Sequence, residues 1–226
     1  MTPARRGPSS ARGALPSGTS VGTAPSGTPG AGPVGHLRGA RVSLRPPAPE
    51  DLPLLFRWLN DPDAIAPWDR FEVDSFESLQ NALRDAPGDP LSLAPRFLLR
   101  RASDDRPIGV VGYFNSYTAL DTVDVWYAIC LPEERGKGYG SEAVQLLADY
   151  VFSHRNVERV GATSDVENPA SWKLLERLGF RREGTLRRAL FHHGGWHDVA
   201  IYGLTREEWR TLRHPDRKSP REPAKS

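Results

Sequence analysis

The sequence is poor in sulfur, with one cysteine (Cys130) and one methionine in 226 residues. A single cysteine excludes a disulfide within the chain and suits a reducing compartment, so we expect a cytoplasmic protein. Residues 1–38 contain no acidic residue and no apolar run long enough for a signal peptide or a membrane span. We therefore expect no membrane partner.

Charge is unevenly distributed along the chain. The formal net charge is +2, but residues 1–38 contribute +4 through four arginines, and residues 213–226 contribute +3 through five basic and two acidic residues. The +2 total less the +7 of these two segments leaves −5 for residues 39–212. An acidic domain disfavours nucleic acid as the main partner and suits a cationic amine.

Composition divides the chain into one domain and two tails. Residues 1–38 are rich in Gly, Pro, Ser and Arg, and residues 213–226 in Pro, Lys and Arg. Such segments bury too little apolar surface to offset their ordering entropy, so we expect both to be disordered. A transit peptide is the alternative for residues 1–38, although their Gly and Pro content disfavours an amphipathic helix. Residues 39–212 are the expected domain.

Hydrophobic periodicity in residues 39–212 predicts a mixed α/β domain. Strands are expected at 41–45, 96–101, 108–115, 122–131, 158–165, 184–191 and 196–204. Helices are expected at 50–59, 74–84, 141–154 and 169–178 and after Thr205, with a loop at 85–95. Hairpin turns are expected at Asp104-Asp105 and at His193-Gly194-Gly195.

A glycine-rich run, Arg135-Gly136-Lys137-Gly138-Tyr139-Gly140, lies between an expected strand and an expected helix. Backbone N–H groups at a helix N-terminus, with the helix dipole behind them, favour a phosphate or pyrophosphate. The run lacks the spacing of the nucleotide-triphosphate loop and of the dinucleotide fingerprint. It fits R/Q-x-x-G-x-G/A, which is also compatible with an ordinary strand-to-helix turn.

A second motif follows, in which Asn168 suits a helix N-cap, Pro169 the first helical position and Gly179 the C-terminal end. The order N-x-x-S, apolar helix, L-G-F and R-x-E-G, placed after the glycine-rich run, resembles the GNAT acetyltransferase superfamily over residues 41–210. The resemblance is strongest to the branch that contains ribosomal-protein alanine acetyltransferases. It implies an α/β (α+β) fold with a mixed, mostly antiparallel sheet of about seven strands, flanked by helices and splayed at the cofactor-binding strand.

The resemblance also implies acetyl-CoA as the acyl donor and no metal. Backbone groups of Ile129 and Leu131 would bond the pantetheine, unless they pair with a neighbouring strand instead, and the N–H near Leu131 would polarise the thioester carbonyl. The full set implied to contact the cofactor is Ile129, Cys130, Leu131, Arg135, Gly136, Lys137, Gly138, Tyr139, Gly140, Ser141 and Asn168.

Direct attack of a neutral amine on the thioester is the implied reaction. Ser171 would steady the leaving thiolate, or is simply a first-turn helix serine. Asp124 would assist as a base, or is a solvated strand-edge carboxylate. Cys130 is expected to be a buried small hydrophobe, not a nucleophile. Glu133 and Glu134 are expected to be surface charges, and His192, His193 and His197 to belong to a solvated hairpin and not to a zinc site.

Residues expected at the acceptor groove are aromatic or acidic: Trp58, Trp68, Asp69, Glu72 and Trp126. The alternative for Trp58 and Trp68 is a place in the core, which is more common for aromatic residues on helix faces. The predicted function is acetyl transfer from acetyl-CoA to a primary amine, on a protein N-terminus or a small molecule such as an antibiotic. A non-catalytic acyl-CoA-binding module and a Rossmann-like nucleotide-binding protein are the alternatives. Beyond the amine acceptor, the chain is expected to act as a monomer or a homodimer.

Overall fold

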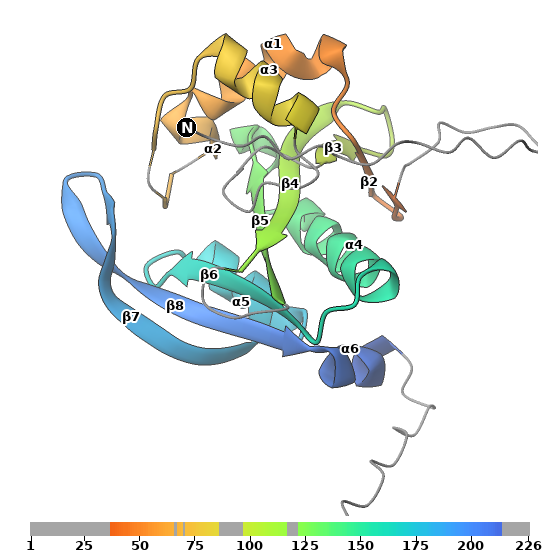
Figure 1. The fold of residues 1–226 in the computed structure, drawn as a ribbon, viewed down its shortest axis with the longest axis vertical. Helices are drawn as coiled ribbons and strands as arrows, with labels where there is room; N and C mark the ends of the chain where they lie inside the picture. Colours follow the sequence, from red (N-terminus) through yellow and green to blue (C-terminus); the bar gives the residue numbers. More distant parts are fainter. Residues whose placement is uncertain (1–36, 66, 70, 86–96, 117–121, 214–226) are drawn as a thin grey trace, which may run out of the picture. The chain divides into compact units, whose positions relative to one another are not determined.

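The computed structural model describes residues 37–65, 67–69, 71–85, 97–116 and 122–213 (Figure 1). Its eight-stranded sheet has the order β1-β2-β3-β4-β5-β6-β8-β7. The strands are β1 (Leu37–Arg38), β2 (Val42–Arg45), β3 (Phe97–Arg101), β4 (Pro107–Asn115), β5 (Thr122–Ile129), β6 (Arg159–Asp165), β7 (Arg181–His192) and β8 (Gly195–Thr205). Only β5 and β6 pair in parallel, which confirms the mixed, mostly antiparallel sheet.

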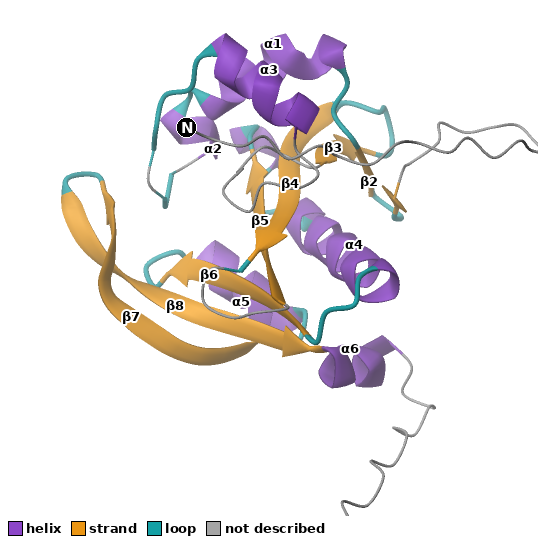
Figure 2. Cartoon of the chain, in the orientation of Figure 1, coloured by secondary structure: helices purple, strands orange, loops and turns teal. Residues whose placement is uncertain are grey.

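Helices lie on both faces of this sheet (Figure 2). The α-helices are α1 (Leu52–Leu59), α2 (Pro62–Ile65), α3 (Phe76–Asp85), α4 (Tyr139–His154), α5 (Pro169–Arg177) and α6 (Arg206–Arg213). Two short 3-10 turns, η1 (Pro49–Asp51) and η2 (Pro132–Glu134), precede α1 and follow β5. No helix in the described part of the chain has the length and apolar character needed to cross a bilayer.

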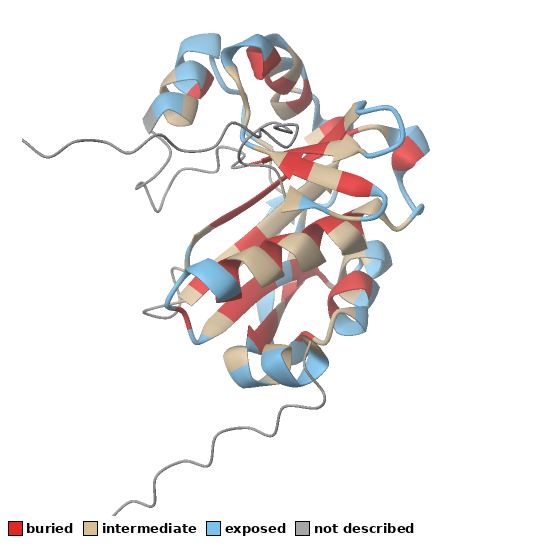
Figure 3. Cartoon of the chain, turned by 90° about the vertical axis from the view of Figure 1, so that its right-hand side faces the viewer, coloured by how far each residue is buried: buried red, intermediate tan, exposed pale blue. Residues whose placement is uncertain are grey.

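The alternation of side chains along β5 divides the core into two clusters. Val123 and Val125 pack on the face covered by α4 and α5, where the larger cluster lies. Trp126 and Cys130 point to the opposite face and contact the cluster built on α1 and α3. Figure 3 shows buried residues along the strands and on the inner side of the helices. Strand β5 is therefore sandwiched between both helical layers.

Element positions agree with the sequence patterns, with differences at the ends. The expected count of about seven strands becomes eight because Leu37 and Arg38, assigned to the disordered tail, pair with β2. Helix α6 likewise extends to Arg213, one residue into the other expected tail. Helix α2 was not predicted, since four residues are too few to show a period. The expected loop at 85–95 lies outside the described residues beyond position 85.

The β7–β8 hairpin is longer and its turn tighter than predicted. His192 pairs with Gly195, so only two residues form the turn. Both have positive φ, 48° at His193 and 77° at Gly194, as a type I′ turn requires. Gly195 therefore begins β8, and the expected three-residue turn is wrong by that residue.

Strands β5 and β6 separate along their length. Their register consists of three pairs and ends at Asp124 and Gly161, whereas β5 stays paired with β4 as far as Ile129. The expected splay at the cofactor-binding strand is therefore confirmed. It leaves one side of β5 without a strand neighbour from residue 125 onward.

Candidate active site

The open side of β5 presents backbone groups. Cys130 donates its N–H to the carbonyl of Ile108 in β4. Because backbone direction alternates along a strand, Tyr127 and Ile129 direct their N–H and C=O groups away from β4, into the splay. The carbonyl of Ile129 accepts a bond of 2.9 Å from Arg135 Nε, and the carbonyl of Leu131 accepts from the N–H of Glu134. Free N–H groups are thus what this edge offers near its end.

The glycine-rich loop turns directly into α4. Gly136 and Gly138 have φ of 73° and 80°, and Gly138 is the N-cap of the helix. The positive φ favours glycine at position 138, and a side chain there would also stand 2.5 Å from Arg41 Nη2 and displace that guanidinium. No N–H of residues 136–141 donates to another residue in the described ranges. These N–H groups form a cradle suited to an anion.

The two cations of the loop, Arg135 and Lys137, already have partners within the protein. Arg135 donates to the carbonyls of Ile129, Asp63 and Ala64, and so ties the loop to α2. Lys137 Nζ lies 3.1 Å from Glu134 Oε2. The structure places both residues beside the cradle, with their charges already paired or hydrogen-bonded.

Arg41 is a third cation at the loop, contributed by the residue before β2. Its Nη2 donates to the carbonyl of Lys137 at 2.6 Å, and its guanidinium lies 5.3 Å from the centre of the Tyr139 ring. Its Nε also pairs with Glu142 at 3.4 Å. The side chain remains 52% exposed, so it adds accessible positive charge next to the free N–H groups.

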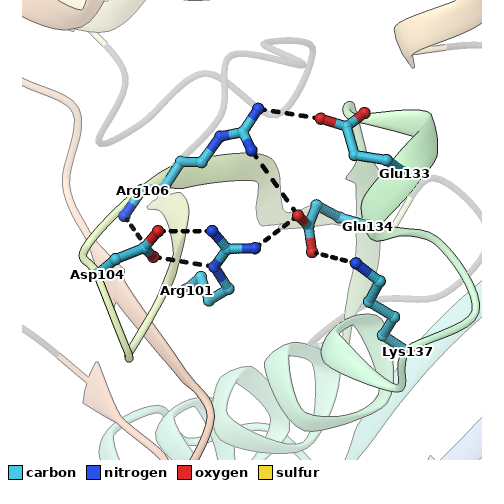
Figure 4. A network of polar contacts seen from close by, with 6 residues as sticks. All are labelled: Arg101, Asp104, Arg106, Glu133, Glu134 and Lys137. Carbon is cyan, nitrogen blue, oxygen red and sulfur yellow. Dashed lines mark hydrogen bonds and ion pairs between the residues drawn. The ribbon is translucent and has the colours of Figure 1, made fainter.

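Glu134 lies between three cations beside the loop (Figure 4). Its side chain is 2% exposed and contacts Arg101 at 2.6 Å, Lys137 at 3.1 Å and Arg106 at 3.9 Å. The expectation of a surface charge is therefore wrong for Glu134, because three cations compensate its burial. Glu133 is exposed and pairs with Arg106, as expected. Arg101 also bonds Asp104 and holds the pKa of that carboxyl down to about 2.

Two hydroxyl groups meet at the first turn of α5. Asn168 caps this helix, its side chain accepting from the N–H of Ser171 at 3.2 Å. Ser171 Oγ lies 3.0 Å from the phenol oxygen of Tyr127. Tyr127 comes from the splayed part of β5, so the pair spans the opening between β5 and α5. Burial raises the pKa of Tyr127 to about 12, so the phenol keeps its proton at neutral pH.

Asp124 lies where β5 and β6 part. Its Oδ2 accepts from Ser116 Oγ at 3.0 Å, and its Oδ1 lies 3.9 Å from Arg159, which also binds Glu183. A side chain at Gly161 would stand 2.1 Å from Oδ1, so that glycine makes room for the carboxyl. Burial raises the pKa of Asp124, against the hydrogen bond from Ser116. The Asp124 side chain is 16% exposed, so the carboxyl is less solvated than a strand-edge residue would be, and its role as a base stays a prediction.

The residues expected at the acceptor groove differ in burial. Trp58 is 7% exposed and packs in the core beneath α1, although it also lines a surface pocket beside Arg57 and Leu131. Trp68 is 41% exposed and meets His192 edge-on, with ring centroids 6.5 Å apart. Asp69 and Glu72 are exposed on the same loop. Trp126 lies over Gly112, and its buried Nε1 has no acceptor among the described residues.

The three histidines of the hairpin differ from the expectation of a solvated group. His192 is buried, and its Nε2 lies 2.6 Å from Asp165 Oδ2. His197 Nδ1 lies 3.4 Å from the same oxygen, and only His193, in the turn, is exposed. The spacing of the histidines gave no sign of Asp165, which lies 27 residues earlier in the chain.

Cys130 is 2% exposed, and burial raises the pKa of its thiol to about 12. A thiol of this kind is a poor nucleophile at neutral pH, as expected of a buried small hydrophobe.

Comparison with known proteins gives the family of this domain. The acetyltransferase (GNAT) domain family matches residues 41–181. The chain belongs to the GNAT acetyltransferase family. It is 31% identical over 177 residues to the uncharacterized N-acetyltransferase p20 of Bacillus licheniformis, covering 75% of this chain and 95% of p20. The earlier resemblance to this superfamily is confirmed.

Two solved structures share the fold of this GNAT chain. A ribosomal-protein-S5-alanine acetyltransferase from Vibrio fischeri superposes with a TM-score of 0.65 at 23% identity, over 77% of this chain and 98% of that one. A spermidine N-acetyltransferase from Vibrio cholerae, in complex with CoA and spermine, superposes with a TM-score of 0.64 at 24% identity, over 76% of this chain and 99% of that one. The family match and the similarity to p20 make the GNAT chain an acyl-CoA-dependent N-acetyltransferase in class.

The sequence alone did not assign three residues of the candidate site: Arg41, Tyr127 and Glu134. Arg41 is 96 positions from its partner Lys137, and Tyr127 is 44 positions from Ser171. Glu134 adjoins the loop motif but shows its burial only when β3 and the loop come together. Only Tyr127 carried a sequence signal, as a tyrosine in the strand expected to hold the cofactor.

Proposed function

We propose that this protein transfers the acetyl group of acetyl-CoA directly to a primary amine of a cationic acceptor. The observation that carries the proposal is the continuity of two features. The splayed edge of β5 leads straight into the N–H cradle of residues 136–141. A pantetheine arm and a pyrophosphate are joined in the same order, so one extended molecule fits both.

Acetyl-CoA would be held mainly by backbone groups. The pyrophosphate would accept from the N–H groups of the cradle, with Arg41 beside it. The pantetheine amides would pair with the open edge of β5 at Tyr127 and Ile129, as an added strand does. This order places the thioester beyond Tyr127, beside Ser171, and not at Leu131. The N–H of Leu131, expected to polarise the thioester carbonyl, would instead face the pyrophosphate end of the pantetheine arm, and Asn168 keeps its expected contact to the cofactor. No metal enters this proposal.

Ser171 and Tyr127 would supply the proton that the leaving thiolate needs. As the C–S bond breaks, the thiolate takes a proton from the Ser171 hydroxyl, and Tyr127, still protonated at neutral pH, donates in turn to Ser171. Asp124 would take the proton that the nitrogen loses once it bonds to the acyl carbon. Its raised pKa brings the carboxyl closer to a base matched to neutral pH.

A cationic acceptor is supported by charge and by the relatives. Residues 39–212 carry a net charge of −5, and the face that holds Asp124 also holds Glu183, Asp165 and Glu167. The spermidine enzyme and the ribosomal-protein enzyme that share the fold both act on amines. A protein N-terminus or a small-molecule amine fits this class, and an α-amine with pKa near 8 needs less help from a base than a lysine near 10.4.

Labelled acetyl-CoA and a panel of amines test the proposal. The panel contains α-amino peptides, lysine peptides, a polyamine and an aminoglycoside, and mass spectrometry follows label on each amine and on the protein. Label on at least one amine, with release of free CoA in equal amount, is the expected result. Tight binding of acetyl-CoA without transfer to any amine would favour the alternative of a non-catalytic acyl-CoA-binding module.

A further inference from the structure

The face of the sheet that carries Asp124 holds a second cluster of titratable groups. Asp124 lies opposite Gly161 in β6, and Asp165 is four residues further on the same face of that strand. Asp165 pairs with Val199 in β8, and His197 follows on that face, two positions from Val199. The cluster therefore lies at the hairpin end of the face on which Asp124 stands.

Burial and hydrogen bonding fix the centre of this cluster. The Asp165 side chain is 0% exposed; its Oδ1 accepts from the N–H of Glu167 at 2.6 Å, and its Oδ2 contacts His192 Nε2 at 2.6 Å. A carboxylate only accepts hydrogen bonds, so His192 Nε2 carries the proton. The other nitrogen of His192 lies 2.9 Å from His193 Nδ1. Both nitrogens of His192 are thus committed within the protein.

His197 is arranged differently. Its Nδ1 lies 3.4 Å from Asp165 Oδ2 and 3.5 Å from Glu167 Oε2. Two acidic oxygens near Nδ1 favour the tautomer with the proton on that nitrogen, which leaves a lone pair on Nε2. No residue in the described ranges hydrogen-bonds Nε2, and a side chain at Gly195 would stand 3.4 Å from it. His197 is 20% exposed, so its free nitrogen is reachable.

The same three side chains offer possible metal ligands, all within 4.8 Å of one another. However, the rings of His192 and His197 are stacked, with centroids 3.9 Å apart and planes 17° from parallel. Two imidazoles bound in plane to one tetrahedral zinc would hold their centroids roughly 5 Å apart. The 2.6 Å contact of His192 with Asp165 is also a hydrogen-bond distance. The geometry is that of a proton-sharing group.

We propose that His197, oriented by Asp165 and Glu167, takes the first proton from the acceptor ammonium and so delivers a neutral amine for attack. The proposal rests on the proposed function. The ammonium N–H proton moves to His197 Nε2, and the nitrogen keeps the electron pair. After attack, the second proton passes to Asp124, and the thiolate takes one from Ser171. Two protons leave the amine; one replaces, by way of solvent, the proton that Ser171 gave to the sulfur, and the other is released, so ammonium and thioester yield amide, thiol and one proton.

The placement of neighbouring groups supports two separate proton acceptors, His197 for the first proton and Asp124 for the second. Asp124 is hydrogen-bonded by Ser116 at the point where the strands part, whereas His197 stands at the outer end of the face. Trp68, on the loop after α2, meets His192 edge-on, so a chain segment far away in sequence faces this cluster. The groups that face His197 are Asp165, Glu167 and His192.

The test compares His197→Gln with His154→Gln, a matched loss of an exposed imidazole on α4. For His197→Gln we expect kcat/KM to fall roughly a hundredfold at pH 7, with acetyl-CoA affinity unchanged. The loss should shrink as pH rises above the pKa of the acceptor amine, and added imidazole should restore part of the rate. His154→Gln should match the wild type throughout.

If the fall in kcat/KM of His197→Gln changes neither with pH nor with added imidazole, His197 has a structural role and the proposal is overturned. A His197→Gln variant as active as the wild type at every pH would overturn it too. If the wild type acetylates no amine, the proposed function fails instead. Nitrogen-15 NMR of the imidazoles gives a reading that does not depend on activity: we expect a proton on Nδ1 and none on Nε2 of His197 at neutral pH. The opposite tautomer, or stoichiometric zinc in the purified protein, would overturn the proposal.

Discussion

The phenol oxygen of Tyr127 lies 3.0 Å from the hydroxyl oxygen of Ser171, and these two atoms join strand β5 to helix α5 across the splay. A strand residue and a helix residue 44 positions apart thus share one hydrogen bond beside the expected position of the thioester sulfur.

Removing either hydroxyl should slow the chemical step. Ser171→Ala should lower kcat about a hundredfold with acetyl-CoA affinity unchanged, because a proton donor to the thiolate is lost. Tyr127→Phe should lower kcat about tenfold, since Ser171 remains but loses its own donor. Tyr202→Phe, which removes a buried hydroxyl bonded to Glu176, is the control. Steady-state kinetics and calorimetry make the measurement, and a Tyr127→Phe enzyme with unaltered kcat would limit Tyr127 to packing.

Arg41 should contribute to cofactor affinity through charge. Arg41→Gln should weaken acetyl-CoA binding about tenfold at low salt and less at high salt, because an exposed cation near a phosphate is screened by ions. Arg38→Gln, on the exposed neighbouring strand, should leave affinity unchanged. Calorimetric titration at two ionic strengths measures both. If Arg41→Gln and the wild type bind acetyl-CoA with equal affinity at low salt, the guanidinium contributes only to the structure, through its contacts with Lys137 and Glu142.

Asp124→Asn should slow catalysis and stabilise the fold. Burial raises the pKa of this carboxyl in the folded chain, above the value of about 3.9 in an unfolded one. The stability from this group is therefore complete below about pH 4 and lost as pH rises through the folded pKa. Asparagine does not ionise, so the variant avoids this loss of stability at neutral pH, and its amide oxygen still accepts the hydrogen bond from Ser116. Melting temperatures should favour the variant at neutral pH, with the difference vanishing near pH 4, while kcat falls about a hundredfold.

Cys130 should be dispensable for turnover. Its thiol pKa is raised to about 12 by burial, so almost no thiolate exists at neutral pH. Cys130→Ala should retain turnover within a few-fold, apart from a lower melting temperature from the small cavity. Mass spectrometry of the wild type with labelled acetyl-CoA should find no acetyl group on Cys130. A labelled cysteine together with an inactive variant would instead establish a covalent route.

The fold was largely predictable because its signals are local. β-branched and aromatic residues predict the strand at 122–131. Asn168, Pro169 and Gly179 mark the ends of the helix at 169–178, and each acts within a turn or two of the chain. The glycine loop was predictable for the same reason. Helix α2 and strand β1 were missed because two or four residues carry no periodicity, and they form only against neighbours already in place.

The site was less predictable because its key contacts join distant segments. The burial of Glu134 depends on Arg101, 33 residues away, and that of His192 on Asp165, 27 residues away. No pattern within the loop or the hairpin contains that information. Trp58 shows the converse, since an aromatic residue on a helix face serves a core as readily as a groove. The roles assigned to Ser171 and Asp124 stay predictions.

The early end of the β5–β6 register has a consequence for the whole chain. An unpaired strand edge is a place where another strand can add, which makes such edges prone to aggregation. Here the edge lies next to the cradle, so the ligand that pairs with it would also protect it. Any molecule that binds the folded state but not the unfolded one stabilises the fold by mass action. The lifetime of this protein should therefore follow the acetyl-CoA and CoA supply around it, so that a shortage of cofactor removes the enzyme as well as its activity.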